Sequence, residues 1–161
     1  MSALSLCALP SVGLPSTPKY KMAPSWVSAT SIYVKKSTRQ MFLMHKDLVI
    51  KIYTVQLGHN PIGHKRYKGD GRTPEGVYRI THRNPQSAFH LSLGVSYPNA
   101  TDRSVARRNN WNPGGDIFIH GRGPKSRPGR DWTAGCIAVE DWEMDEIWKK
   151  VKPGTRIKIV A

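Results

Sequence analysis

Cysteine and acidic residues are both scarce in this chain. Its 161 residues include two cysteines, Cys7 and Cys136, and 11 Asp and Glu against 25 Lys and Arg. Two cysteines exclude a scaffold stabilised by several disulfides. Metal-binding spacings such as Cys-x-x-Cys and His-Glu-x-x-His are missing as well, so we predict neither a metal centre nor a cofactor. No apolar run approaches the roughly 18–20 residues of a membrane-spanning helix, and no membrane span is predicted.

The excess of basic side chains gives a formal net charge of +14 at pH 7. Such a surface attracts polyanions without specifying which one, so nucleic acid, anionic membrane and acidic cell-envelope polymers all remain open. The hydrophobic fraction of 39% and the charged fraction of 22% are ordinary for a globular protein. They exclude a collagen-like, coiled-coil or wholly disordered chain, and the length fits one domain with a tail.

Residues 1–30 differ in composition from the rest of the chain. The first 18 residues carry no charged side chain, and prolines at positions 10, 15, 18 and 24 oppose a helix. An export signal needs a basic segment followed by a long apolar core. Residues 1–30 have no basic residue before their short apolar stretch. We therefore interpret residues 1–30 as a disordered tail or a degenerate export signal, and residues 31–161 as the folded domain.

The folded part is rich in short apolar runs that predict strands. Six such runs occupy residues 40–45, 48–57, 77–81, 90–95, 116–120 and 156–160. Lys46 and Asp47 separate the first two runs and predict a hairpin turn. Twelve of the 14 glycines lie between Gly58 and Gly135, which predicts long loops on a mainly β scaffold, where functional sites tend to lie.

One helix is expected, over the sequence EDWEMDEIWKKVKPG that begins at Glu140. Met144, Ile147 and Val151 recur at helical spacing. Acidic residues lie at its start and lysines at its end, which complements the helix dipole. Pro153 and Gly154 follow and end the helix.

Cys136 and His120 are the candidate chemical groups. Gly135 allows a tight backbone next to Cys136, and the helix that follows would favour a thiolate. His120 ends an apolar run and could act as the base that a thiol nucleophile needs. A lone cysteine can also be a small buried apolar residue, so the residue types alone leave both interpretations open.

Ile-His-Gly at 119–121 is followed by TAGCIAV at 133–139, with Cys136 sixteen residues after His120. This arrangement resembles the signature of the L,D-transpeptidase catalytic domain of the YkuD type. The segment 57–80, with Thr-Pro-Glu-Gly at 73–76, resembles the glycine-rich segment of that family. The resemblance extends from about residue 32 to residue 160.

The resemblance implies a mainly β, sandwich-like fold and thiol acyl chemistry on peptidoglycan stem peptides. Cys136 would attack the carbonyl of the third stem residue and form a thioester, with His120 as base and acid. The Gly135 and Cys136 N–H groups would stabilise the oxyanion. An amine from another stem or from a wall-anchored lipoprotein would accept the acyl group, in the periplasm or cell envelope. Asp116 or a backbone carbonyl would orient His120.

One position departs from the family pattern. Many members carry Arg two residues after the cysteine, where this chain has Ala138. The motifs are closer to a subgroup with members that cut the link between lipoprotein and peptidoglycan. Arg72 and Arg122 could replace the missing charge toward a substrate carboxylate. The residues predicted to bind substrate are Gly121, Arg122, Thr133, Arg72 and His64.

Two alternatives stay open. Water in place of an amine would make the protein an L,D-peptidase, or hydrolase. Alternatively, the basic clusters at residues 65–68 and 103–108 could belong to a non-catalytic module that binds nucleic acid or wall polymer. No helix-turn-helix, RNA-recognition or zinc-finger pattern accompanies these clusters, so nucleic acid is not the predicted partner.

Overall fold

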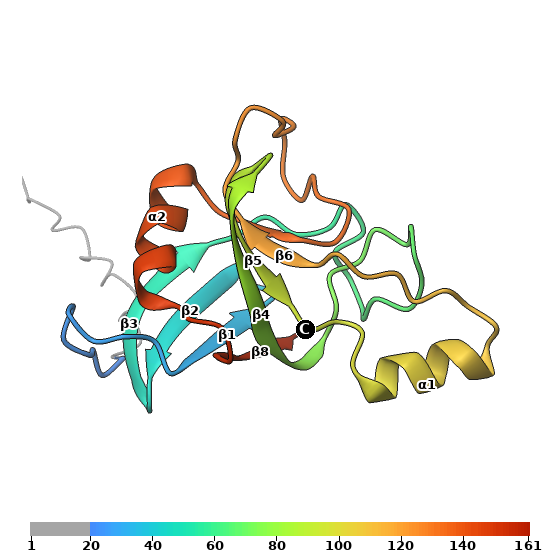
Figure 1. Cartoon of the computed structure of the whole chain (residues 1–161), viewed down its shortest axis with the longest axis horizontal. Coiled ribbons are helices and arrows are strands. Elements are labelled where there is room, and N and C mark those ends of the chain that lie inside the picture. The colour runs from blue at the N-terminus through green and yellow to red at the C-terminus, as the bar shows by residue number, and fades with distance from the viewer. Residues whose placement is uncertain (1–19) are drawn as a thin grey trace, which may run out of the picture.

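The structure is a computed structural model that describes residues 20–161 (Figure 1). Within these residues it contains strands β1 (Ser31–Lys35), β2 (Gln40–His45), β3 (Leu48–Thr54), β4 (Gly76–Ser87), β5 (His90–Val95), β6 (Phe118–His120), β7 (Ile137–Ala138) and β8 (Arg156–Val160). The helices are α1 (Ala100–Arg108) and α2 (Asp141–Lys150). Neither helix is long and apolar enough to cross a bilayer.

The strands form one mixed sheet in the order β3-β2-β1-β8-β4-β5-β6-β7. β1 to β3 make an antiparallel meander, and β8 pairs in parallel with β1 and antiparallel with β4. Figure 1 shows that the sheet twists and curls strongly along this order. The predicted mainly β class is confirmed, and the expected sandwich-like form is a single curled sheet.

The apolar runs build the core because alternate strand residues face the same side of the sheet. The fully buried side chains include Leu43 on β2, Leu93 on β5 and Ile157 on β8. The predicted hairpin turn between β2 and β3 is present, with Lys46 in the left-handed region at φ 56°.

Helix α2 confirms the helix expected from periodicity. Its Met144 and Ile147 side chains are fully buried in the core, and the helix packs beside β5. Glu140 precedes the helix, and its backbone N–H donates to the Glu143 carboxylate at 2.9 Å. Because α2 is fixed at its start, it also fixes the segment that leads into it from β7.

Helix α1 was not predicted. Only Asp102 and Ala106 are buried along it, so the sequence carries no apolar stripe to reveal it. Its start is held by polar contacts instead: the Asn99 side chain accepts from the Asp102 N–H, and the Asp102 carboxylate accepts from the Asn99 N–H. This reciprocal cap stabilises a helix of low apolar content.

Residues 20–30 lie against the sheet and against α2. The Ala23 N–H donates to the Val49 carbonyl at 2.8 Å, and the Val49 N–H donates to the Lys21 carbonyl at 2.9 Å. The Ala29 N–H donates to the Lys150 carbonyl at 3.0 Å. The tail or export-signal interpretation of residues 1–30 stays a prediction for residues 1–19, which lie outside the described residues.

Candidate active site

The topology of the sheet brings Cys136 and His120 together. β6 and β7 pair in parallel, with His120 opposite Ala138, and Cys136 directly precedes β7. The chain between them loops out and returns to the same edge of the sheet. Both side chains line one cavity of about 440 Å³.

His120 is held as a buried, neutral imidazole. The residue is only 4% exposed, and its ring stacks on Phe89 with centroids 4.7 Å apart and meets Trp132 edge-on at 5.8 Å. Burial lowers the pKa of His120 below its ordinary value, against a smaller opposing effect of its hydrogen bond to Gly121. Nδ1 lies 2.6 Å from the Gly121 carbonyl. Because a carbonyl only accepts, Nδ1 carries the proton and Nε2 keeps a free lone pair, so a backbone carbonyl, rather than Asp116, orients the ring.

The start of α2 fixes the carbonyl that orients this ring. The Asp141 Oδ1 atom accepts hydrogen bonds from the Arg122 and Gly123 N–H groups at 2.7 and 3.0 Å. A Cβ atom at Gly121 would lie 2.4 Å from the same oxygen. Gly121 is therefore required, because a side chain at this position would collide with the Asp141 carboxylate.

Cys136 is a protonated thiol in the resting structure. Burial raises the pKa of Cys136 to about 11, and the Phe118 N–H and the Lys65 ammonium oppose this rise only in part. Its Sγ atom donates a weak hydrogen bond to the Asp116 carbonyl at 3.4 Å. The thiolate expected from the helix start is thus not favoured, because α2 begins only at Asp141 and the partial burial of Cys136 disfavours a charged sulfur.

The Cys136 loop is shaped by Thr133. The Thr133 hydroxyl donates to the Cys136 carbonyl at 2.7 Å and accepts from the Gly135 N–H at 3.1 Å. Gly135 adopts φ 137°, and a Cβ there would lie 2.7 Å from the Arg72 carbonyl. The Gly135 N–H, predicted as an oxyanion donor, is thus already bonded within the loop. Among residues 20–161 the Cys136 N–H has no hydrogen-bond partner.

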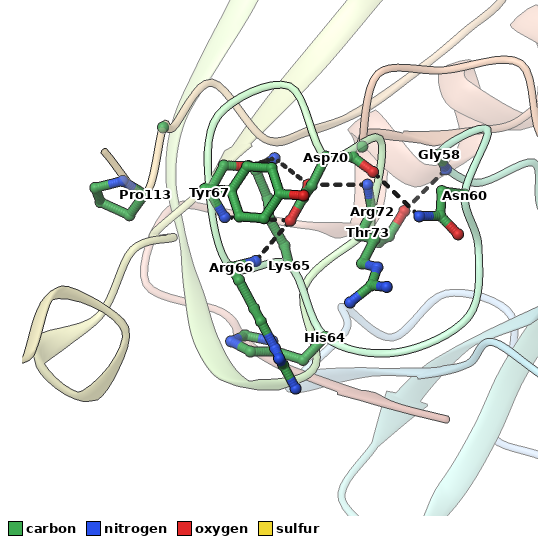
Figure 2. Close-up of polar contacts among 12 residues, drawn as sticks. Gly58, Asn60, His64, Lys65, Arg66, Tyr67, Asp70, Arg72, Thr73 and Pro113 are labelled. Carbon is green, nitrogen blue, oxygen red and sulfur yellow. Dashed lines mark hydrogen bonds and ion pairs between the residues drawn. The ribbon is translucent and has the colours of Figure 1, made fainter. Parts of the chain in front are cut away.

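A buried ion pair organises the glycine-rich segment behind this loop (Figure 2). The Asp70 carboxylate accepts from the Lys65 ammonium at 2.9 Å and from the Arg66 and Arg72 N–H groups at 2.7 and 3.1 Å. Burial alone would raise the pKa of Asp70, but these hydrogen bonds hold it below its usual value. The backbone from Lys65 to Arg72 therefore closes around one carboxylate.

A second cavity, of about 570 Å³, also reaches Cys136. Lys65, Lys68 and Asp116 line it together with the thiol. The Cys136 residue thus lines two cavities, whereas His120 lines only the smaller one. The sequence marked Lys65 and Lys68 as part of a basic cluster, but nothing in it placed them beside Cys136.

Four of the five residues predicted to bind substrate, Gly121, Arg122, Arg72 and His64, do not line either cavity. The Arg122 Nε atom donates to the Glu140 carboxylate at 2.8 Å. His64 lies between the Asp102 carboxylate and the Glu75 N–H at 3.0 and 2.9 Å. The Arg72 side chain points away from Asp70 in Figure 2, and its Nε atom is buried without a partner among the described residues.

Thr133 does line the smaller cavity, and its binding of substrate stays a prediction. The sequence did not indicate Phe89, Lys125, Arg127 or Trp132 as site residues, because they come from separate loops. The smaller cavity is also lined by His59, Phe89, Lys125, Arg127 and Trp132.

Comparisons with known proteins identify the family of this chain. The family model of the L,D-transpeptidase catalytic domain (YkuD) matches residues 29–159. The chain belongs to this L,D-transpeptidase family. It is 28% identical over 93 residues to the Escherichia coli (strain K12) protein named "Putative L,D-transpeptidase YafK", covering 56% of this chain and 32% of that protein.

Solved structures show the same L,D-transpeptidase-like fold. The cell shape determining protein Pgp2 from Campylobacter jejuni matches with a TM-score of 0.65 and 18% identity, over 83% of this chain and 48% of that chain. The L,D-transpeptidase from Xylanimonas cellulosilytica matches with a TM-score of 0.56 and 17% identity, over 88% of this chain and 65% of that chain. The present L,D-transpeptidase domain thus spans less than two thirds of these relatives.

Proposed function

We propose that this L,D-transpeptidase domain is a cysteine-dependent acyl transferase that acts on peptidoglycan stem peptides through a thioester. The observation that carries the proposal is the cavity that Cys136 and His120 share. The imidazole there is neutral, and its Nε2 atom stays free because the hydrogen bond to the Gly121 carbonyl uses Nδ1. A neutral imidazole beside a protonated thiol is the pair that general-base activation of a nucleophile requires.

The first half of the reaction transfers the acyl group to sulfur. His120 Nε2 takes the Cys136 proton while Sγ attacks the carbonyl carbon of the stem peptide. The Cys136 N–H is the backbone donor left for the developing oxyanion, an interaction worth roughly 2.7–4 kcal/mol in well-studied acyl transfers. The imidazolium then protonates the leaving amine, so that the C–N bond breaks as the C–S bond is kept.

The second half returns the acyl group to an amine. The incoming amine gives a proton to His120, attacks the thioester carbon and releases the Cys136 thiol, which recovers its proton. Two cavities that meet at the sulfur support this proposal, because one can hold the acyl chain while the other exchanges leaving group for acceptor. A wall-anchored lipoprotein could supply either group. Since the substrate lies in the cell envelope, we place the protein there.

Mass spectrometry of muropeptides incubated with the purified protein tests this function. We expect loss of the terminal D-amino acid and, when an acceptor amine is added, a product heavier by that amine. Cys136→Ala should abolish both, while Ser104→Ala, on the exposed face of α1, should preserve them. Full turnover by the Cys136→Ala variant would refute the mechanism.

The same assay separates the alternatives. Cleavage without amine incorporation at any acceptor concentration would identify an L,D-peptidase instead of a transferase. Specific retention of oligonucleotides, with an unchanged muropeptide profile, would identify a polyanion-binding module.

A further inference from the structure

The cavity beside His120 has a cationic wall. Lys125 and Arg127 line it from the loop that joins β6 to β7. Of the described residues that line this cavity, none is acidic. Neither cation forms an ion pair within residues 20–161, whereas the nearby Arg122 is paired with Glu140. Two positive charges thus face the reactive groups without a partner of their own.

The position of His120 decides which part of the substrate meets these charges. This step rests on the proposed function, in which the His120 imidazolium protonates the leaving amine. The leaving group must therefore lie on the side of His120, and the acceptor amine must enter the same place to give its proton to the same nitrogen. The larger cavity reaches Cys136 but not His120, so it is left for the acyl chain.

The chemistry of the leaving group matches the cationic wall. A D-amino acid released from the end of a stem carries a carboxylate one carbon away from its amine. We propose that Lys125 and Arg127 bind this carboxylate, and then the carboxylate beside the acceptor amine, so that they select amines with an adjacent carboxylate. Lysine and arginine both donate charge-assisted hydrogen bonds to carboxylates. Phe89 and Trp132 line the same cavity and flank the His120 ring, which limits the water around it.

Binding to a Cys136→Ala protein tests the subsite without chemistry. The probes are two stem tetrapeptides that differ only at the terminal D-amino acid, a free carboxylate in one and a carboxamide in the other. We expect calorimetry to give about tenfold tighter binding of the carboxylate, because an exposed charge-assisted pair contributes modestly. In the Lys125→Gln, Arg127→Gln double variant the ratio should fall to about one.

Arg130→Gln is the matched control, since Arg130 lies in the same exposed loop but does not line the cavity. It should keep the tenfold ratio. Equal binding of the two peptides by the Cys136→Ala protein, or an unchanged ratio in the double variant, would overturn the subsite even if the unaltered protein cleaves stems. If the Cys136→Ala protein keeps the tenfold ratio but the unaltered protein never forms a thioester at Cys136, the subsite stands and the proposed function alone is overturned.

Discussion

At Cys136 and His120, burial moves both pKa values in the direction that keeps the side chains uncharged: up to about 11 for the thiol and down for the imidazole. Burying two neutral groups costs less desolvation free energy than burying a thiolate and an imidazolium. In the proposed mechanism the proton therefore moves when substrate is present, and the two resting side chains differ from a preformed thiolate–imidazolium pair.

The pH dependence of Cys136 alkylation should show this resting state. With a pKa of about 11, the thiolate fraction and the rate of reaction with iodoacetamide should rise about tenfold per pH unit between roughly pH 7 and 10. Mass spectrometry of the Cys136 peptide measures the rate. A plateau that extends below neutral pH would instead indicate a preformed thiolate–imidazolium pair.

Replacement of His120 should affect catalysis strongly. His120→Ala should lower the rate of D-amino acid release by about 10²–10⁴-fold, the usual contribution of a general acid–base group. His45→Ala is a control, because His45 lies at the end of β2 and lines neither cavity. Release within a few-fold of the unaltered rate in His120→Ala would exclude His120 as the proton carrier.

Among the elements, the site is assembled from the β6 end, the Cys136 loop and the glycine-rich segment 57–76. Close approaches hold these loops together: a Cβ at Gly58 would lie 2.1 Å from the Gly71 carbonyl oxygen, and the Gly58 N–H donates to the Thr73 hydroxyl at 3.0 Å. Thr73 of the Thr-Pro-Glu-Gly motif thus holds Gly58, which in turn pairs with Thr133 of the Cys136 loop. The close approach of Gly58 to Gly71 is one that only glycine permits.

The buried pair in this segment should be important for stability. Asp70→Asn leaves the Lys65 ammonium, 4% exposed in its side chain, without its counter-charge, so the free energy of unfolding should fall by about 3–5 kcal/mol. The pKa of Asp70 is lowered in the folded state. Its contribution is therefore present above about pH 4 and is lost as pH falls through the folded pKa.

Urea unfolding at several pH values measures both effects. The variant should show a weaker loss of stability in acid than the unaltered protein. Asp145→Asn is the control, because its pair with His90 is half exposed and should contribute less than about 1 kcal/mol. An Asp70→Asn protein as stable as the control variant would show that the pair is not needed.

For the whole molecule, the net charge of +14 produces a positive field over the surface. Such a field raises the encounter rate with anionic ligands and is screened by salt. This long-range attraction does not distinguish one carboxylate from another, in contrast to the local contacts in the His120 cavity. The two effects can therefore be separated by ionic strength.

The specificity constant for an anionic stem peptide should fall as salt rises. Between roughly 0.05 and 0.5 M NaCl we expect kcat/KM to fall about tenfold, because the Debye length shortens from above 10 Å to a few Å. The fully amidated stem should show a much shallower dependence in the same release assay. Equal salt dependence for both stems would show that the net charge does not assist binding.

The sequence by itself indicated six of the eight strands within residues 20–161, helix α2 and the two candidate reactive residues, since these depend on local periodicity and on motifs read along the chain. It missed α1, because polar capping at Asn99 and Asp102 leaves no apolar pattern. It also assigned Arg72 and Arg122 to the substrate, because the partners of a charged side chain cannot be inferred from its neighbours in sequence.

Only the tertiary structure decided the charge state of the site and the side chains that surround it. Burial, which depends on the whole fold, makes Cys136 a thiol and His120 a neutral base. The pairing of β6 with β7 places Lys125 and Arg127 at one cavity, and the Asp70 contacts place Lys65 at the other. Solvent exclusion and contacts between distant segments arise only when the chain is packed, so local sequence cannot specify them.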